Sequence, residues 1–315
     1  MSYASDFITT AKREFRYLAR REFDELQENT VGILLVLPLV ATLVALYLYP
    51  TVQAIIYSLQ DISIFLGDSE VVGLANYIDL LRSGTFYNAL WNGIIYTAGS
   101  VFLTVVVGVA TGLLLNRTFT GERIATGLIL VPYMVPTVAA VILFRWMLDG
   151  LYGVGNYALV VSTLIDEPIA WLASTRYAMP ALILISGWRL YPFVTMLVLA
   201  KLQTIPKSYY ESARLMGASR WEMFRHITLP QLRGVLFVAI LLRLVWTFNL
   251  FDIIWLGTQG GPGNATETLP IMAYRLTFIG NDLGEGASVA VVTFLVLAVI
   301  VYGYFRLYGT TEEPR

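Results

Sequence analysis

Residues 206–230 read PKSYYESARLMGASRWEMFRHITLP and separate two apolar runs of the chain, at about 177–200 and about 232–256. Each run is long enough to cross a bilayer as a helix, because about twenty apolar residues span the hydrocarbon core. The segment between the runs is charged and aromatic, so it belongs in water at one side of a membrane. The stretch therefore predicts two neighbouring spans joined by a structured, water-facing loop.

The composition of the whole chain agrees with a membrane protein. Of 315 residues, 57% are hydrophobic and 14% are charged, whereas soluble domains carry about 25% charged residues. We expect an all-α integral membrane protein with six transmembrane helices, at about 31–58, 89–115, 124–147, 177–200, 232–256 and 287–307. Pro38, Pro132, Pro136 and Pro192 fall within these spans, where neighbouring helices can satisfy the freed carbonyl groups. The interrupted stretch 151–171 is interpreted as an external loop with a short interfacial helix.

Basic residues are distributed unevenly over the two sides that six spans define. Fifteen lysines and arginines fall on the side that carries both termini, and four fall in the opposite loops. Cytoplasmic loops are enriched in these residues, so we expect a multi-pass protein of the cell membrane with both termini in the cytoplasm. Residues 1–30 then form a helix on the membrane surface, or a flexible charged tail, before a six-span domain over 31–308. Residues 309–315 form a cytoplasmic tail.

Several classes of function are excluded by residue counts. The net charge of −1 gives no electrostatic basis for nucleic-acid binding. The chain has no cysteine and one histidine, His226, so we expect no disulfide, thiol chemistry, metal site or cofactor in it. It also lacks the GxxxxGK[ST] phosphate loop, so it cannot hydrolyse ATP alone. No pattern of an intramembrane enzyme is present.

The first half of the loop 206–230 has the pattern of a short helix that ends in a turn. Pro206 can begin a helix because its missing N–H has no partner at that position. Tyr209, Ala213 and Met216 then fall on one face, with charged residues on the other. Gly217 permits a left-handed stop.

The second half of the loop predicts another short helix. Ser219 is a natural N-cap, and Glu222 three residues later completes a capping box. The helix presents Trp221 and Phe224 until Pro230 ends it. Large apolar side chains in a water-facing loop indicate a surface that a partner covers. An amphipathic segment lying on the membrane surface is the alternative.

This helix–turn–helix resembles the EAA loop of ABC importer permeases, whose pattern is Glu-Ala-Ala, three residues, glycine, nine residues and Ile-x-Leu-Pro. The residues in the positions of the pattern are Glu211, Ser212, Ala213, Gly217, Ile227, Leu229 and Pro230, and serine in place of alanine is the departure. In that family the loop sits in a cleft of the ATPase subunit. The resemblance implies an ATPase-coupling site formed by Glu211, Ser212, Ala213, Gly217, Ala218, Trp221, Phe224 and Pro230.

A second tract, residues 258–269, reads TQGGPGNATETL. Its glycines allow a tight external turn. The tract resembles that of carbohydrate importers of the maltose, trehalose and glycerol-3-phosphate type, and implies the first of two permease subunits. The implied partners are a second, homologous permease subunit, two ATPase subunits that bind ATP and magnesium, and an extracytoplasmic solute-binding protein. Asn264 also begins a glycosylation sequon, Asn-Ala-Thr.

Polar and aromatic residues inside the fourth and fifth spans are candidates for a substrate path, because such residues tend to face a cavity or a partner. The candidates are Asn249, Tyr191, Trp188, Thr195 and Asp252, with Arg189 beside them. Resemblance to the maltose permease favours Asn249. As alternatives, these polar groups only join helices, and Arg189 and Arg243 pair with Asp252 or with lipid head groups.

The sequence therefore predicts the permease subunit of an ATP-driven importer that moves a sugar or sugar derivative into the cytoplasm by alternating access. Two alternatives remain open: import of a non-sugar solute such as glycerol-3-phosphate, and ion-coupled secondary transport, which needs no ATPase-docking loop. The chain itself is not expected to be an enzyme.

Overall fold

The computed structural model describes residue 30 and residues 33–63 and 69–309. The chain divides into two units, Met1–Ile56 and Tyr57–Arg315. The expected surface helix over residues 1–30 lies, apart from Thr30, outside the described residues, as does the tail after residue 309.

The first predicted span is confirmed as a helix of 25 residues, Ile33–Tyr57. It contains a π-helical segment, Val44–Leu48, that continues directly into α2, Tyr49–Tyr57. Pro50 follows the π turn by two residues. A proline has no N–H for the carbonyl group four residues earlier, and a wider turn is one way for a helix to absorb that loss.

The second unit opens with an antiparallel hairpin, β1 (Gln60–Ile62) and β2 (Ser69–Val71), in which Gln60 lies opposite Val71. Its long helices are α4 (Gly84–Leu115), α8 (Ala178–Gln203), α11 (Leu229–Phe248) and α14 (Leu283–Gly309). The bent pair is α5 (Glu122–Met134) and α6 (Thr137–Met147). The short helices are α3 (Ala75–Arg82), α7 (Val154–Val161), the 3₁₀ turn Trp171–Ala173, α9 (Lys207–Leu215), α10 (Arg220–Met223), α12 (Asp252–Thr258) and α13 (Leu269–Tyr274). Two further π segments are Phe224–Thr228 and Arg275–Ile279.

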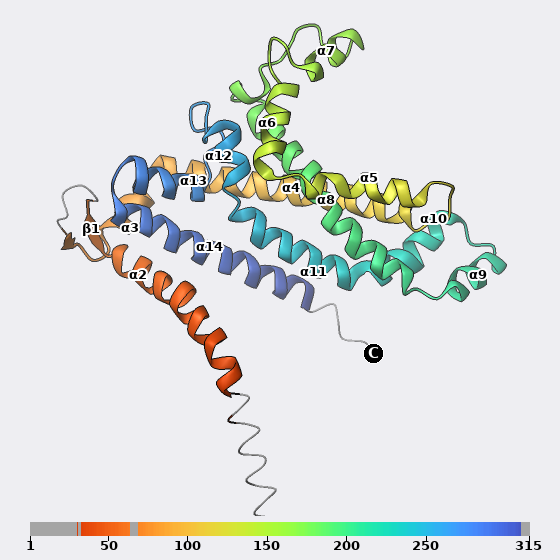
Figure 1. The fold of residues 1–315 in the computed structure, drawn as a ribbon, viewed down its shortest axis with the longest axis horizontal. Helices are drawn as coiled ribbons and strands as arrows, with labels where there is room; N and C mark the ends of the chain where they lie inside the picture. The colour runs from red at the N-terminus through yellow and green to blue at the C-terminus, as the bar shows by residue number, and fades with distance from the viewer. Residues whose placement is uncertain (1–29, 31–32, 64–68, 310–315) are drawn as a thin grey trace, which may run out of the picture. The chain divides into compact units, whose positions relative to one another are not determined.

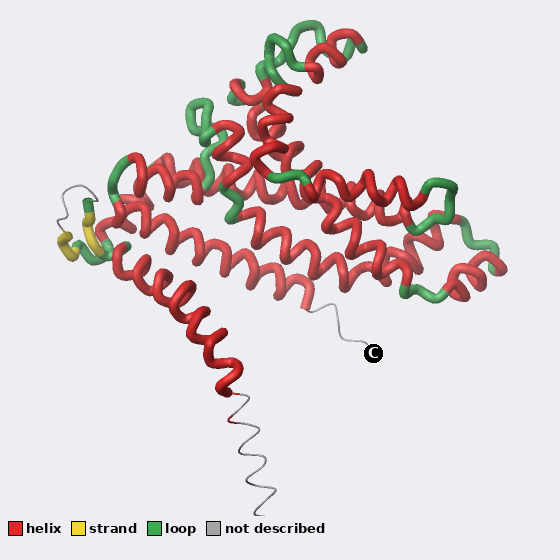
Figure 2. Tube along the Cα trace, in the orientation of Figure 1, coloured by secondary structure: helices red, strands yellow, loops and turns green. Residues whose placement is uncertain are grey.

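The prediction of an all-α membrane protein is confirmed. Five helices are long and apolar enough to cross a membrane, and the bent pair brings the total to six. Figure 2 shows that helices make up nearly all of the described chain, with short loops between them. In the second unit, α9 and α10 lie at one end of the bundle, and α3 with the β-hairpin lies at the other (Figure 1). The helix α7 has eight residues, too few to span, as expected for the stretch 151–171.

The third and fifth spans were predicted wrongly as continuous helices. Helices α5 and α6 meet at an angle of 97°. The break is at Val135, which is extended because the ring of Pro136 disfavours helical geometry in the residue before it. The fifth helix ends at Phe248 rather than near 256, and the chain bends at Asn249–Phe251 before α12 begins. Pro132 and Pro192 lie inside helices, as predicted.

Helices α4 and α8 pack closely against each other. A Cβ atom added at Gly108 would lie 2.6 Å from Cβ of Val194, and one added at Gly112 would lie 2.8 Å from Cγ1 of Val198. The hydroxyl groups of Thr111 and Thr195 are 2.7 Å apart across the same interface. Lipid and side chains are similarly apolar, so close packing of small residues and interhelical hydrogen bonds hold membrane helices together.

Candidate functional site

The loop at one end of the bundle folds as a helix–turn–helix, called the elbow (residues 206–230) from here on. Its first helix, α9, ends before Gly217, which has a φ of +83°. Glycine adopts this left-handed conformation without the strain that a Cβ atom would cause. The predicted capping box is present, since Ser219 N–H donates to Glu222 Oε2 over 2.7 Å and Glu222 N–H donates to Ser219 Oγ over 3.3 Å.

The elbow is attached to the bundle by one face of α9. Ala213 is buried, and the hydroxyl of Tyr210 lies 3.0 Å from that of Thr228. Tyr209 and Met216, predicted to share a face with Ala213, are both exposed. Tyr210 packs against the apolar cluster that contains Leu202 and Ile205, and this contact attaches α9 to the bundle.

The tip of the elbow is apolar and uncovered. Leu215 is 90% exposed, and Trp221 is 66% exposed with its ring 5.5 Å from that of Phe224. Exposing these apolar side chains to water is energetically unfavourable, so the tip is suited to contact a partner. The expected exposure of aromatic groups is confirmed for Trp221, while Phe224 is half-buried.

The elbow is continuous with a span. The helix that begins at Arg220 runs through the π segment Phe224–Thr228 into α11, and the whole of Arg220–Phe248 is one helix of 29 residues. The prediction that Pro230 ends the second helix is therefore wrong. Pro230 follows the π segment Phe224–Thr228 by two residues, and a wider turn is one way for a continuous helix to absorb the missing N–H of a proline. Helices α10 and α11 are thus parts of one continuous helix.

A cavity of about 810 Å³ lies between the elbow and the end of α4. Four basic residues line it, namely Arg117, Lys207, Arg214 and Arg220, and Glu211 is the single acidic residue in its wall. None of the four forms an ion pair within the described part of the chain. The cavity is therefore electropositive.

The predicted substrate-path residues separate into two groups. Trp188, Tyr191 and Thr195 take part in contacts between helices: the Trp188 ring packs edge-on against Phe144, and the Tyr191 hydroxyl donates to Ile129 O over 3.2 Å. Thr195 is fully buried against α4.

The second group, Asn249 and Asp252, lies where α11 and α12 are interrupted, and both side chains are exposed. Asn249 is the C-cap of α11, and its side-chain amide donates to Val245 O over 3.1 Å. The bend brings these two polar residues to one break in the helical path. Both stay predictions as substrate contacts.

The tract 258–269 forms the expected tight turn at the end of α12. Gly260 and Gly263 have φ values of +85° and +55°. The hydroxyl groups of Thr258 and Thr266 lie 2.7 Å apart and close the turn. Thr266 is fully buried, so packing accounts for a threonine at this position.

Arg275 fastens this turn to the following helix. Its guanidinium donates to Gln259 O over 2.9 Å and to Asn264 Oδ1 over 3.0 Å, and lies 3.2 Å from Glu267 Oε1. Glu267 is 1% exposed, and its burial raises the pKa of the carboxyl group while Arg275 opposes that rise. Arg275 is one of the four basic residues predicted to lie in the loops opposite the termini.

Two asparagines of α4 also hold the 258–269 turn in place. The side-chain amide of Asn92 donates to Asn264 O and to Glu267 O, each over 3.0 Å, and that of Asn88 donates to Asn264 O over 2.8 Å. Sequence reasoning missed both. Their spacing of four residues at the start of an apolar helix is the signal that could have found them, because it places both amides on one face.

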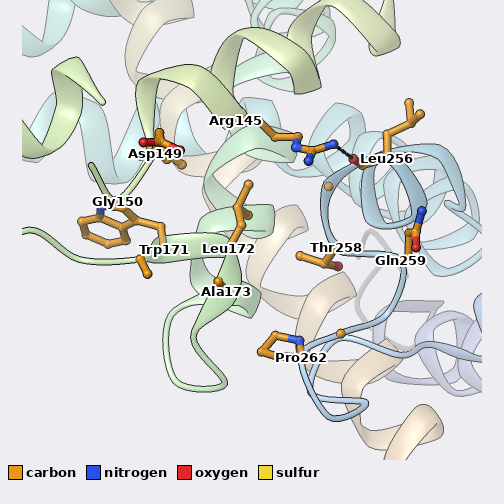
Figure 3. A pocket seen from close by; sticks show the side chains of 14 residues that line it. Arg145, Asp149, Gly150, Trp171, Leu172, Ala173, Leu256, Thr258, Gln259 and Pro262 are labelled. Carbon is orange, nitrogen blue, oxygen red and sulfur yellow. Dashed lines mark hydrogen bonds between the residues drawn. The ribbon is translucent and has the colours of Figure 1, made fainter. Parts of the chain in front are cut away.

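A second cavity, of about 510 Å³, opens beside this turn (Figure 3). One wall is the end of α12, and Arg145 reaches it by donating to Leu256 O over 3.3 Å. The other wall is the loop around Asp149 and Trp171, which the buried side chain of Asn156 binds together through Asp149 O, Ile169 O and Trp171 Nε1. Two backbone N–H groups donate to the Asp149 carboxylate and hold its pKa low.

A helical bundle with five to six apolar spans and an exposed, apolar-tipped elbow at one end is the architecture of a membrane-spanning transport component. The family of binding-protein-dependent transport system inner membrane components matches residues 104–309. This chain belongs to that family and is a multi-pass membrane protein.

Relatives and solved structures agree with this assignment. The trehalose/maltose transport system permease MalF of Thermococcus litoralis is 32% identical over 89% of this chain and 94% of its own. The sulfoquinovosyl glycerol transport system permease SmoG of Agrobacterium fabrum is 31% identical over 91% and 93%. In fold, the chain resembles a subunit of a bacterial ABC transporter involved in the import of the acidic polysaccharide alginate. The TM-score is 0.80 at 19% identity, over 93% of this chain and 100% of that subunit.

Proposed function

We propose that this chain is the permease subunit of an ATP-driven importer that carries a sugar or sugar derivative into the cytoplasm by alternating access. The observation that carries the proposal is the elbow, whose uncovered apolar tip is continuous with α11 through one helix, Arg220–Phe248. Such a lever is what a separate motor subunit needs to move a span.

The motor is a pair of partner ATPase subunits, which bind ATP and magnesium. Their cleft covers the exposed Leu215 and Trp221, and removing these side chains from water stabilises the contact. Acidic groups of the ATPase enter the electropositive cavity beside Glu211, where Arg117 and Arg214 are unpaired within the described residues. Gly217 keeps the bend that separates α9 from α10, and Ser212, Ala213, Ala218, Phe224 and Pro230 keep its shape.

The substrate passes the break between α11 and α12. A displacement of the elbow moves α11, which ends at Asn249, so motor and substrate contact are joined by one element. Sugars are recognised by amides, hydroxyls and aromatic rings, and Asn249 supplies an exposed amide there. The names of the trehalose/maltose and sulfoquinovosyl glycerol permeases support a carbohydrate substrate.

The remaining partners are a second, homologous permease subunit and an extracytoplasmic solute-binding protein. The second permease covers apolar helix faces, and the binding protein delivers substrate to the end of the bundle that holds the β-hairpin and the 258–269 turn. Both termini and the elbow face the cytoplasm, as the distribution of lysine and arginine indicates.

Energy coupling is tested with the full importer in proteoliposomes. We expect uptake only with hydrolysable ATP inside the compartment that the elbow faces, and no loss of uptake when ionophores collapse ion gradients. Uptake that continues without ATP and follows an ion gradient would instead establish the secondary-transport alternative.

The role of the elbow is tested by two substitutions of one residue. Gly217→Val places a β-branched side chain at a φ of +83°, which distorts the turn, whereas Gly217→Asn places there a residue that tolerates this conformation. We expect Gly217→Val to lower ATP-dependent uptake at least tenfold while ATPase activity persists, and Gly217→Asn to retain most uptake. Equal coupling in both variants contradicts the assigned role.

A further inference from the structure

Two arginines lie inside the spans of this chain, Arg189 in the middle of α8 and Arg243 in the last third of α11. Arg243 is 3% exposed, and one of its guanidinium nitrogens donates to Thr247 Oγ1 over 2.9 Å. The two arginines are close enough to repel each other electrostatically. The fold thus concentrates positive charge inside the membrane-spanning part of the bundle.

Neither arginine has a counter-ion in the part of the chain that the structure describes. The Arg275–Glu267 contact is the one ion pair among those residues. Asp252, the carboxylate that the sequence offers as a partner, is exposed at the start of α12 and is not paired with either arginine. The Nε atoms of Arg189 and Arg243 are buried without a hydrogen-bond partner.

Buried hydroxyl groups lie close to Arg243. The hydroxyl of Tyr96 on α4 lies beside those of Ser100 on the same helix and of Ser186 on α8. Tyr96 is also within electrostatic reach of Arg243. Two helices, α4 and α8, therefore place hydroxyl donors in the region of the bundle interior that holds Arg243.

Unpaired charge inside a membrane protein is unfavourable and is retained where it serves a substrate or ion pathway. Buried donors without acceptors favour the binding of an anion, because an anion accepts several hydrogen bonds and offsets positive charge at the same time. Asn249 lies six residues beyond Arg243, about 9 Å along the helix axis. The charged region therefore adjoins the break at which the substrate is proposed to pass.

We propose that the imported sugar carries a negative charge, as a carboxylate, phosphate or sulfonate group, and that Arg189 and Arg243 bind this group during its passage. The proposal rests on the proposed function and specifies its substrate class. Guanidinium groups suit this role because they stay protonated and match the geometry of carboxylate and phosphate oxygens. Tyr96, Ser100 and Ser186 supply further donors.

The test uses the purified full importer without its binding protein and three probes: glucose, glucuronate and glucose 1-phosphate, compared at equal ionic strength. Binding is followed by intrinsic tryptophan fluorescence, to which Trp188 and Trp246 contribute from positions next to the charged region. We expect both anionic probes to bind at least tenfold more tightly than glucose. Equal binding of the three probes, or binding of none of them, overturns the proposal.

Substitutions assign the preference to the arginines. Arg189→Gln removes one charge from a half-buried position and should reduce the preference for anionic probes to less than threefold. Arg233→Gln, an exposed position on the same helix as Arg243, is the matched control and should leave the preference unchanged. If Arg189→Gln leaves the anion preference intact but releases the second permease subunit, the charge pairs with a carboxylate of that subunit and the proposal is wrong.

Different results would contradict the anionic substrate class and the proposed function. An importer that needs ATP for uptake but favours neutral sugars leaves the proposed function standing and overturns the anionic class. An importer whose uptake does not require ATP contradicts the proposed function itself, whichever sugar charge it prefers.

Discussion

Arg275 is the residue on which the 258–269 turn depends, because its guanidinium joins Gln259, Asn264 and Glu267. Its side chain is 36% exposed, while that of Glu267 is nearly inaccessible. Removing the exposed partner of such a pair leaves an uncompensated charge behind, whereas removing the buried charge does not. The two members of the pair should therefore respond unequally to substitution.

We expect Arg275→Met to destabilise the protein by about 2 kcal/mol, below the 3–5 kcal/mol typical of fully buried pairs, because solvent screens part of the interaction. Glu267→Gln keeps the bonds of Arg275 to Gln259 and Asn264 and should destabilise by less than about 1 kcal/mol. Thermal unfolding of the purified complex, followed by tryptophan fluorescence, measures both. A larger loss for Glu267→Gln than for Arg275→Met would show that the pair is not the source of stability.

The same carboxyl group makes stability depend on pH. Burial raises the pKa of Glu267 in the folded protein, so the folded state holds the proton more tightly than the unfolded state does. The stabilising contribution is thus present at acidic pH and is lost as the pH rises through the raised pKa. We expect the difference in unfolding midpoint between wild type and Glu267→Gln to shift in favour of wild type on acidification. A difference that is constant with pH would contradict this assignment.

At the scale of secondary-structure elements, the α4–α8 contact depends on glycine. A Cβ atom at Gly108 would lie 2.6 Å from Val194 Cβ and 3.1 Å from the backbone nitrogen of Thr195, and the backbone atom cannot move without shifting α8. We expect Gly108→Ala to destabilise the bundle by about 1–3 kcal/mol, the usual range for overpacking. Gly127→Ala in α5 is the control, since nothing lies within 4 Å of its added Cβ atom. The midpoints of thermal unfolding of the two variants are compared. Equal midpoints would show that α4 and α8 can move apart to accommodate the added methyl group at no cost in stability.

At the scale of the whole molecule, the six spans place the elbow and the loop after α7 on opposite sides of the membrane. The chain has no cysteine, so single cysteines report topology without a background. We expect a membrane-impermeant maleimide to label Ser162→Cys in right-side-out vesicles and Ser208→Cys in inside-out vesicles; both positions are exposed. Labelling of both from the same side would require an even number of crossings between them, instead of the single crossing by α8, and would overturn the topology.

Sequence by itself determined the features that depend on local or periodic signals. The spans follow from apolar length, because a bilayer accepts backbone only where its polar groups are satisfied within the segment. The turn at Gly217 and the capping box of Ser219 and Glu222 follow from bonds that reach three residues along the chain. These interactions form whatever else the helices contact.

Tertiary structure alone decided which faces and which distant residues meet. Three features could not be predicted from the sequence. They are the packing of Tyr210 rather than Tyr209 at the base of the elbow, the 97° bend after α5, and the hydrogen bonds from an α4 amide to Asn264 O and Glu267 O. The last of these contacts join residues more than 170 positions apart. That Arg189 and Arg243 have no carboxylate partner among the described residues also appears only in three dimensions, because the helices that pack around a charge decide whether it is paired.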